Sequence, residues 1–403
     1  MTIPFDFNAY SSLLLPAFVQ GLAYAMLVLW RYKRDRDTHD LFLALILLLL
    51  TVRLSFWMLG FAGWYDSHDA FTVFMFYFPF NTVVFIGPCL YFYFISLTNS
   101  TFRFTKELWP HLLLPALVSL LYVGKFIIDF IFYYPFPSNE QAQFGSHGPF
   151  AQLDKTELVY LISYCSIGYY VVLVIRSFKN YNEYLLANYS QTRHINLLWL
   201  KNLLFFAGAS ITLMGIFYLA GLFGAQIDYK MNWYPYLFLG IVIYYIAFYG
   251  YMKGPLLGKE LAFVVDSATD HTFDRPVLET TPQLLKLKEK LDELIAVEKP
   301  YLRPDLTLAE LAKLCQSNTV LVSKVINEGH QKNFNEYING LRVDAVIEQL
   351  KLGTHQKLKL MSIAYDCGFN SKTTFNRTFK SITGISPQHY ISTHLGKTSG
   401  SKL

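Results

Sequence analysis

The feature that most constrains the fold of this chain is a series of long apolar stretches. Seven of them reach the length of about 20 residues that a membrane-spanning helix needs. They lie at roughly 12–30, 40–62, 71–97, 108–131, 158–178, 198–224 and 232–251. Hydrophobic residues make up 53% of the chain and charged residues only 16%, whereas soluble domains hold about 45–50% and about 25%. The sequence therefore predicts a seven-span transmembrane helical bundle over residues 1–252.

The distribution of Lys and Arg between these stretches predicts an orientation. Short cytoplasmic loops collect basic residues. The loops after the first, third and fifth stretches hold ten, whereas the other side holds only Lys155 and Lys230. We therefore expect the N-terminus outside the cell and the C-terminal domain in the cytoplasm. The expected location is the inner (plasma) membrane of a bacterial cell, which the chain would cross several times.

Three ionisable residues inside or beside the apolar stretches, Arg53, Lys125 and Asp129, are candidate signal-sensing positions, because charges are costly in lipid. Counting inward from the cytoplasmic ends puts all three in the outer portion of the membrane. An Arg53 to Asp129 pair is geometrically allowed there. Snorkelling or a purely structural pair is the alternative reading, and the sequence favours it slightly.

A change of composition follows the last apolar stretch. Residues 253–282 contain the helix-breaking Gly254-Pro255 and several Asp, which predicts a cytoplasmic linker. As a flexible chain it would span roughly 30 Å root-mean-square, so the domain beyond it would stay near the membrane. From Pro282 onward there are 17 Lys/Arg and 11 Asp/Glu. This basic excess suits a polyanionic partner.

The domain beyond the linker, residues 283–403, begins with an amphipathic helix. Leucines recur there at spacings of three and four residues, and we expect this face to pack onto the rest of its own domain. They are Leu284, Leu287, Leu291 and Leu294.

The same domain contains an internal repeat. The segments LTLAELAKLCQSNT and LKLMSIAYDCGFNS align at an offset of 52 residues. Each predicts a short helix with a small residue at its middle, Ala312 or Ala364, where a second helix can cross closely. Gly368, four residues after Ala364, suits the left-handed turn of a helix-turn-helix. The first copy has Gln316 there instead, which makes its turn less well specified.

After the turn, the copies realign at an offset of 53, which implies one extra turn residue in the second. Each following helix keeps two apolar anchors four residues apart, Val322 and Ile326 in the first copy and Phe375 and Phe379 in the second. The faces between them carry Lys, Arg, Asn and Ser, which bind base edges and phosphates in the major groove. The two units span about 307–328 and 360–383.

A third apolar stripe, from Phe334 to Leu350, lies between the two units. It predicts a long helix that would hold them at a fixed separation. A rigid spacer of this kind permits insertion into successive major grooves, one DNA turn or about 34 Å apart.

The domain resembles the AraC family of bacterial transcription regulators. MSIAYDCGFNSKTTFNRTFKSITGISPQHY is similar to that family's signature, and VSKVINE with NFNEYINGLRVDAVIEQL is similar to its Bacteroidetes members. The resemblance covers about 283–392 and implies seven helices with recognition helices near 319–328 and 371–383. Ile391 departs from the Arg that the family often has there. Carried over by position, the implied DNA contacts are Asn318, Thr319, Ser323, Lys324, Asn327, Ser371, Lys372, Thr373, Asn376, Arg377 and Lys380.

The resulting expectation is an all-α chain that works as a membrane-anchored one-component transcription regulator controlled by a signal at the spans. The alternative is a seven-span receptor or transporter whose cytoplasmic domain docks proteins. An enzyme is a poor third, because no phosphate-binding loop, metal cluster or nucleophile motif is present. No cofactor or metal is expected, and the four cysteines lack metal-ligand spacing. The expected partners are double-stranded DNA and membrane lipid, with a homodimer and an unidentified signal ligand or membrane partner left open.

Overall fold

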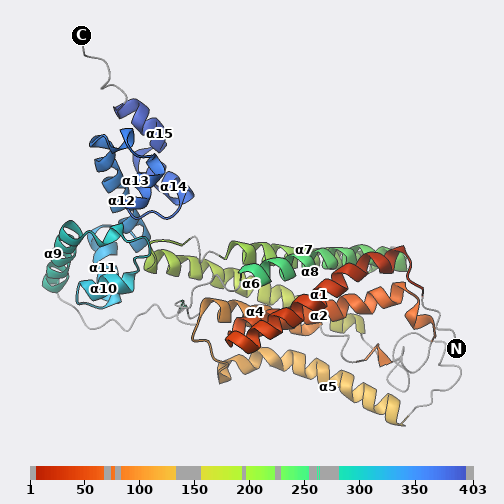
Figure 1. Ribbon diagram of the computed structural model, residues 1–403. Helices are drawn as coiled ribbons and strands as arrows, with labels where there is room; N and C mark the ends of the chain where they lie inside the picture. The colour runs from red at the N-terminus through yellow and green to blue at the C-terminus, as the bar shows by residue number, and fades with distance from the viewer. Residues whose placement is uncertain are drawn as a thin grey trace. The chain divides into compact units, whose positions relative to one another are not determined.

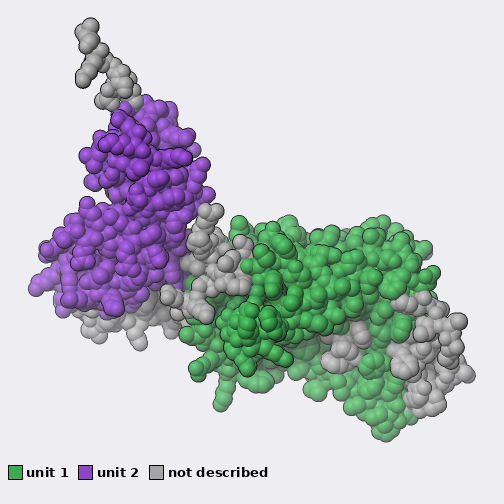
Figure 2. Space-filling view, in the orientation of Figure 1, with its two compact units in different colours: residues 1–178, 197–265 green, residues 179–196, 266–403 purple. Residues whose placement is uncertain are grey.

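The computed structural model of the chain describes residues 6–67, 74–77, 83–132, 156–192, 197–222, 228–253, 261, 263 and 281–395. Helices make up the regular structure of these residues (Figure 1), apart from isolated β-bridge residues, among them the pair Tyr189 and Thr307. The predicted all-α class is confirmed. The chain forms two compact units (Figure 2), the first of residues 1–178 and 197–265, the second of residues 179–196 and 266–403.

The first unit holds the apolar helices. Its α-helices are α1 (Ala9–Asp35), α2 (Thr38–Phe61), α4 (Val83–Thr98), α5 (Leu113–Ile127), α6 (Thr156–Asn188, up to residue 178), α7 (Leu198–Leu222) and α8 (Trp233–Lys253). A 3-10 turn, Lys106–Leu112, precedes α5, and a π-helical turn, Ile128–Phe132, follows it. Six helices of the described residues are long and apolar enough to cross a membrane, and they coincide with six of the seven predicted spans.

The remaining predicted span, 71–97, is a shorter helix. Only α4, Val83–Thr98, is described there together with residues 74–77. Its 16 residues would extend roughly 24 Å at 1.5 Å per residue, which is less than the roughly 30 Å of a hydrocarbon core. The rest of this stretch lies outside the described residues. Every described side chain of α4 except two is buried, so this helix is an interior element of its unit.

Helices α1, α2 and α8 pack together in the first unit (Figure 1). Arg31, which the charge pattern places in a cytoplasmic loop, belongs to the last turns of α1 and is 5% exposed. Its Nε and Nη2 donate to the Asp40 carboxylate of α2 at 2.6 and 2.5 Å, and its Nη1 donates to the Tyr251 carbonyl of α8 at 2.6 Å. A bidentate pair with a further backbone acceptor therefore joins the ends of three helices.

The second unit is built around two apolar cores joined by one helix. Its α-helices are α9 (Thr281–Glu298), α10 (Leu308–Leu314), α11 (Thr319–Gly329), α12 (Phe334–Lys351), α13 (Leu360–Asp366), α14 (Lys372–Thr383) and α15 (Pro387–Tyr390). The N-terminal half of α12 packs in the first core through Phe334 and Ile338, and its C-terminal half packs in the second through Val346 and Leu350. The predicted spacer helix is thus present and belongs to both cores.

The amphipathic helix α9 packs within this unit, as predicted. Leu291 is fully buried and Ile295 is 7% exposed, and both belong to the first core. Little of the predicted linker 253–282 is described, but Leu261 and Phe263 are buried against the end of α4. The Phe263 N–H donates to the Thr98 carbonyl at 3.2 Å. That part of the linker is therefore paired with the first unit.

Candidate nucleic-acid interface

The first paired-helix unit consists of α10 and α11. The Thr307 hydroxyl accepts from the Glu310 N–H at 3.2 Å, and the Glu310 carboxylate accepts from the Thr307 N–H at 2.9 Å, which forms a capping box at the start of α10. Burial alone would raise the pKa of Glu310, but these hydrogen bonds and the guanidinium of Arg303 lower it overall. Val322 and Ile326 anchor α11 in the first core with no exposed surface.

The turns of the two units share one hydrogen-bond pattern. Three successive N–H groups after the first helix donate back to carbonyls three to five residues earlier, at 2.9–3.0 Å in both copies. The pairs are Cys315 to Leu311, Gln316 to Lys313 and Ser317 to Ala312 in the first copy, and Cys367 to Ile363, Gly368 to Tyr365 and Phe369 to Ala364 in the second. The 52-residue repeat is therefore a repeat of backbone geometry.

The left-handed turn position is occupied differently in the two copies. Gly368 has φ +90° and Gln316 has φ +51°, so the first copy makes the same turn with a residue that has a side chain. Four residues separate α10 from α11 and five separate α13 from α14. The extra turn residue predicted for the second unit is present.

Both second helices present a polar face. In α11, Val322 and Ile326 point into the core, while Lys324 and Asn327 are exposed. In α14, the buried anchors are Phe375 and Phe379, and the remaining faces carry three basic and no acidic residues. Nine of the eleven side chains predicted to contact DNA are exposed, namely Asn318, Thr319, Lys324, Asn327, Lys372, Thr373, Asn376, Arg377 and Lys380. Ser323 is half-buried.

Ser371 is the exception among these residues. It is 2% exposed, and its hydroxyl accepts from the Thr374 N–H at 3.4 Å as the N-cap of α14. Asn318 is the N-cap of α11, and its side-chain Oδ1 accepts from the Leu321 N–H at 2.8 Å, but the side chain is exposed. The side chain of Ser371 therefore serves the start of its helix, whereas Asn318 caps and still faces outward.

A buried arginine joins the elements around the two units. Arg342 of α12 has no exposed surface, and its guanidinium donates to the carbonyls of Tyr301 and Arg303 at 2.7 Å each. Burial lowers its pKa to about 10. The turn of the second unit touches the same place, because a Cβ added to Gly368 would lie 2.5 Å from the Tyr301 carbonyl oxygen and 2.9 Å from the Arg342 Nε. Arg342 therefore fixes the segment before α10 against α12 and beside the second turn.

The sequence interpretation missed Arg342, although a signal exists. Residues 338, 342, 346 and 350 follow one another at four-residue steps along α12, and the other three are apolar. A basic residue in such a stripe is buried with the rest of it and needs backbone acceptors.

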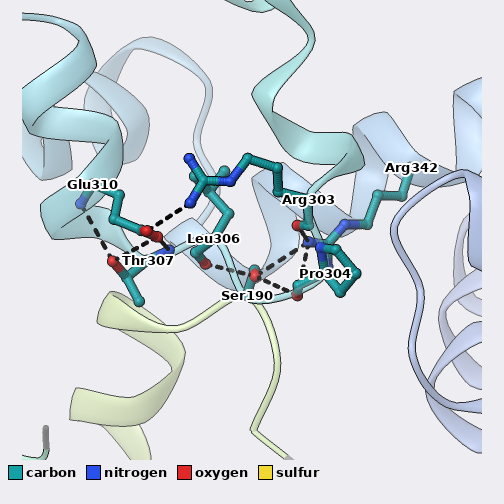
Figure 3. Close-up of polar contacts among 7 residues, drawn as sticks. All are labelled: Ser190, Arg303, Pro304, Leu306, Thr307, Glu310 and Arg342. Atoms are coloured by element: carbon teal, nitrogen blue, oxygen red, sulfur yellow. Dashed lines mark hydrogen bonds and ion pairs between the residues drawn. The ribbon is translucent and has the colours of Figure 1, made fainter.

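Residues 179–192, which we call the strap, comprise the last turns of α6 and the four residues after it, and they belong to the second unit (Figure 3). Ser190 is 1% exposed, and its hydroxyl donates to the Leu306 carbonyl at 2.6 Å and accepts from Arg342 Nη2 at 3.3 Å. Its carbonyl accepts from the side-chain amides of Asn335 and Asn339 at 2.9 and 3.0 Å. The strap is thus held both by the segment that leads into α10 and by α12.

This placement differs from the predicted division of the chain. The fifth span was expected to end near 178 and the first domain to run unbroken to 252, but α6 continues to Asn188 and its end packs with the C-terminal helices. The hydrogen bonds are between residues more than 100 positions apart, so no local pattern announces them.

The three candidate signal-sensing residues lie in the first unit with separate partners. Arg53 of α2 donates to the hydroxyls of Tyr160 and Tyr236. Asp129 is fully buried and accepts from the Tyr77 hydroxyl, and the ammonium group of Lys125 lies 5.5 Å from the centre of the Tyr122 ring. Among the described residues, Arg53 therefore bonds to tyrosines rather than to Asp129.

Two units of paired helices, each with a polar second helix and joined by a helix common to both cores, define a double helix-turn-helix DNA-binding domain. Residues 304–393 match the family described as helix-turn-helix domain. Together with the AraC-type signature, this match identifies the C-terminal part of the chain as an AraC-type helix-turn-helix domain.

Comparison with curated proteins finds regulatory proteins. The chain is similar to the TCP pilus virulence regulatory protein of Vibrio cholerae serotype O1, in both a classical Ogawa and an El Tor Inaba strain. Each match is 30% identical over 106 residues, which cover 25% of this chain and 37% of the relative. The chain thus spans little more than a third of the length of these relatives. No solved structure matches it.

Proposed function

We propose that this protein is a membrane-anchored one-component transcription regulator of a bacterial inner membrane. Its apolar helices would hold it in the bilayer with the second unit in the cytoplasm. Helices α11 and α14 would enter successive major grooves, and a signal received by the first unit would control their binding. The observation that carries this proposal is the pair of exposed polar helices on a common spacer, in a chain with six helices apolar enough to cross a membrane.

The bound state follows from the geometry of the two polar faces. Exposed Lys and Arg beside Asn and Thr suit phosphates and base edges together. The second helix is the stronger candidate for base reading, because Arg377 can make a bidentate pair with a guanine edge and Asn376 with an adenine edge. Lys372 and Lys380 lie about two turns apart on the same helix and suit phosphates.

The strap suggests how a signal would reach the two helix-turn-helix units. Helix α6 belongs to the first unit up to residue 178 and to the second from residue 179. A rearrangement of the first unit that shifts or turns α6 would act on Ser190, which is bonded to the segment before α10 and to Arg342. Such a signal works only if its ligand binds the two arrangements with different affinity. We favour a route in which the signal changes the dimerisation or the release of the two helix-turn-helix units.

The test is DNA selection with the full-length chain in lipid nanodiscs. We expect recovery of sites with two half-sites about one DNA turn apart, and binding that weakens steeply as salt is raised from about 50 to 200 mM. Arg377→Ala should relax the base preference while the chain still inserts in the membrane. If no DNA is recovered at low salt, the proposal fails, and a protein-docking role for the second unit becomes the better reading.

A further inference from the structure

A basic segment of the second unit joins α12 to α13. It consists of residues 351–359, which we call the basic loop. The lysines of this loop are all exposed, namely Lys351, Lys357 and Lys359. The acidic residues nearest to it in the sequence are Glu348 and Asp366, and none lies between them. The loop therefore concentrates positive charge at the surface of the unit.

Two large apolar side chains are exposed in the same loop. Leu352 is 76% exposed and Leu358 is 45% exposed. By contrast, Leu350 is fully buried in the second core. A single exposed leucine is ordinary on a protein surface, but here Leu352 and Leu358 each stand directly beside a lysine in the sequence. The loop thus combines apolar and positive surface within a few residues.

The backbone of the basic loop is held by its own hydrogen bonds. The N–H groups of Lys357 and Leu358 donate to the Thr354 carbonyl at 3.0 and 2.9 Å, and the Gly353 N–H donates to the Leu350 carbonyl at 3.1 Å. These bonds close a tight turn after α12. The exposure of the two leucines therefore belongs to an ordered turn.

Three kinds of partner differ in how they would use this surface. The DNA backbone attracts lysines, but its phosphates offer the leucines nothing. Protein interfaces bury apolar side chains but are depleted in lysine. An anionic lipid surface uses both properties, because lysines pair with headgroup phosphates while apolar side chains enter the boundary between headgroups and acyl chains. Lipid is the partner that the charge and the exposed leucines favour together.

We propose that the basic loop docks on the anionic surface of the membrane that holds the chain. Its lysines pair with lipid phosphates, and Leu352 and Leu358 enter the headgroup boundary. Because the loop leads directly into α13, docking holds the second helix-turn-helix unit at the lipid surface. The strap continues from α6 and supplies the tether. The proposal rests on the proposed function, since it takes the apolar helices to lie in a bilayer.

The reactivity of individual lysines tests this assignment. The full-length chain is placed in nanodiscs of phosphatidylcholine or of phosphatidylglycerol and treated with N-acetoxysuccinimide, and mass spectrometry gives the acetylation rate of each lysine. One lysine at an anionic surface contributes about a fivefold gain in binding, so the rate at the loop lysines should fall at least about fivefold in phosphatidylglycerol. Lys299, an exposed lysine that follows α9, is the internal reference and should keep its rate.

A change of one apolar side chain separates docking from a simple effect of the lipid charge. Leu352→Ser should reduce the protection of the loop lysines at least about threefold, because less apolar surface leaves water. A lower amine reactivity caused only by the surface potential would not respond to the loss of an uncharged side chain. Val297→Ser, which changes a valine of α9 that is 74% exposed, is the matched control and should keep the full protection.

Removal of charge gives the second comparison. Lys351→Gln combined with Lys357→Gln should abolish most of the protection of Lys359. Lys286→Gln combined with Lys290→Gln, which changes two exposed lysines of α9, should leave that protection intact. All these side chains are exposed, so the variants keep the core of the unit.

Equal rates in the two lipids would overturn the proposal, and so would an equal fall at Lys299 or full protection in Leu352→Ser. A random-sequence DNA duplex is added to phosphatidylcholine nanodiscs in a separate arm. Protection of the loop by the duplex and not by phosphatidylglycerol would make the loop a DNA-backbone surface and would also overturn the proposal. The lipid comparison itself contains no DNA. A chain that docks on phosphatidylglycerol but binds no DNA therefore contradicts the proposed function alone, and the reverse result contradicts only the lipid assignment.

Discussion

The turn glycine of the second unit offers the sharpest test of how the reading domain is assembled. Gly368 has φ +90°, and a Cβ there would lie 2.5 Å from the Tyr301 carbonyl oxygen and 2.9 Å from the Leu302 carbonyl oxygen. Gly384, at the end of α14, has φ +81° and no heavy atom within 4 Å of such a Cβ. Alanine at either position meets the same backbone strain, but only at Gly368 does it also meet other atoms.

The expected magnitudes follow from that difference. A side chain in the left-handed region costs about 1–2 kcal/mol, offset by about 0.4–1 kcal/mol from the reduced entropy of the unfolded chain. Gly384→Ala should therefore destabilise by about 0.5–1 kcal/mol. Gly368→Ala must also displace the Tyr301 carbonyl that Arg342 binds, and a lost hydrogen bond to a charged group is worth about 1.5–3 kcal/mol. Its total should be about 2–4 kcal/mol.

Hydrogen exchange of the full-length chain in nanodiscs measures both changes. At about 1.4 kcal/mol per factor of ten, protection of α13 and α14 should fall roughly 30-fold to several hundred-fold in Gly368→Ala and about two- to fivefold in Gly384→Ala. The segment 300–306 should lose protection in Gly368→Ala only. If both variants lose protection equally, or if 300–306 is unaffected, then the second turn is not packed against this segment.

Three further predictions concern the reading face, the strap and the first capping box. Arg377→Ala should weaken specific DNA binding by about 1–3 kcal/mol, whereas Lys351→Ala, an exposed residue at the end of α12, should change it by less than about 0.5 kcal/mol. Fluorescence anisotropy on a selected site measures both, and equal losses would place the contact elsewhere. Asn335→Ala removes two amide hydrogen bonds to the strap, so exchange of the strap should rise by roughly fivefold or more, at about 1 kcal/mol net. Unchanged exchange would show that the strap is held by other groups. Hydrogen bonding lowers the pKa of Glu310, so the capping box contributes fully above the ordinary pKa of 4.5 and loses its contribution as pH falls through the lowered value. Protection of α10 should drop in that window, and Thr307→Ala, which costs about 1 kcal/mol, should remove most of the drop.

The parts of the fold that sequence predicted are those with local signals. The four helices of the paired units follow from apolar spacing and from the residues of their turns. Even the length difference between the turns can be read, as a change of offset from 52 to 53. The turn of the first unit was less well predicted, because a left-handed turn residue that is not glycine cannot be recognised from sequence. The structure shows it in the backbone angle of Gln316, φ +51°. Exposure of the polar faces followed from the buried anchors, except at Ser323, which is half-buried, and Ser371, which is buried.

What sequence left out depends on contacts between distant parts of the chain. Ser190 lies in a segment of ordinary polar composition, and nothing near it indicates bonds to residues 306, 335 and 342. Arg53 was recognised as unusual, and a pair with Asp129 was only one geometrically allowed arrangement. Two opposite charges in apolar stretches allow a pair, whereas the contacts with the hydroxyls of Tyr160 and Tyr236 depend on how α2, α6 and α8 assemble.

Burial of the Arg342 guanidinium carries a desolvation penalty. This penalty bears on why an arginine, rather than an apolar residue, stands at this position of α12. Among the hydrogen bonds described for it, the buried guanidinium of Arg342 has backbone carbonyls, the Asn339 amide oxygen and the Ser190 hydroxyl as acceptors. Such a group is generally less stabilising than a well-packed apolar side chain of the same size, and the pKa lowered to about 10 reflects its burial. An apolar residue at 342 would still fill the stripe of α12, but it could not bind the 300–304 segment and Ser190 together. Because removal of any one acceptor leaves the guanidinium less satisfied, a shift of the strap changes the free energy of the contact with the segment before α10. We infer that an arginine stands here because it links two contacts. Through Arg342, the placement of the first helix-turn-helix unit becomes sensitive to the position of α6, which ends just before Ser190.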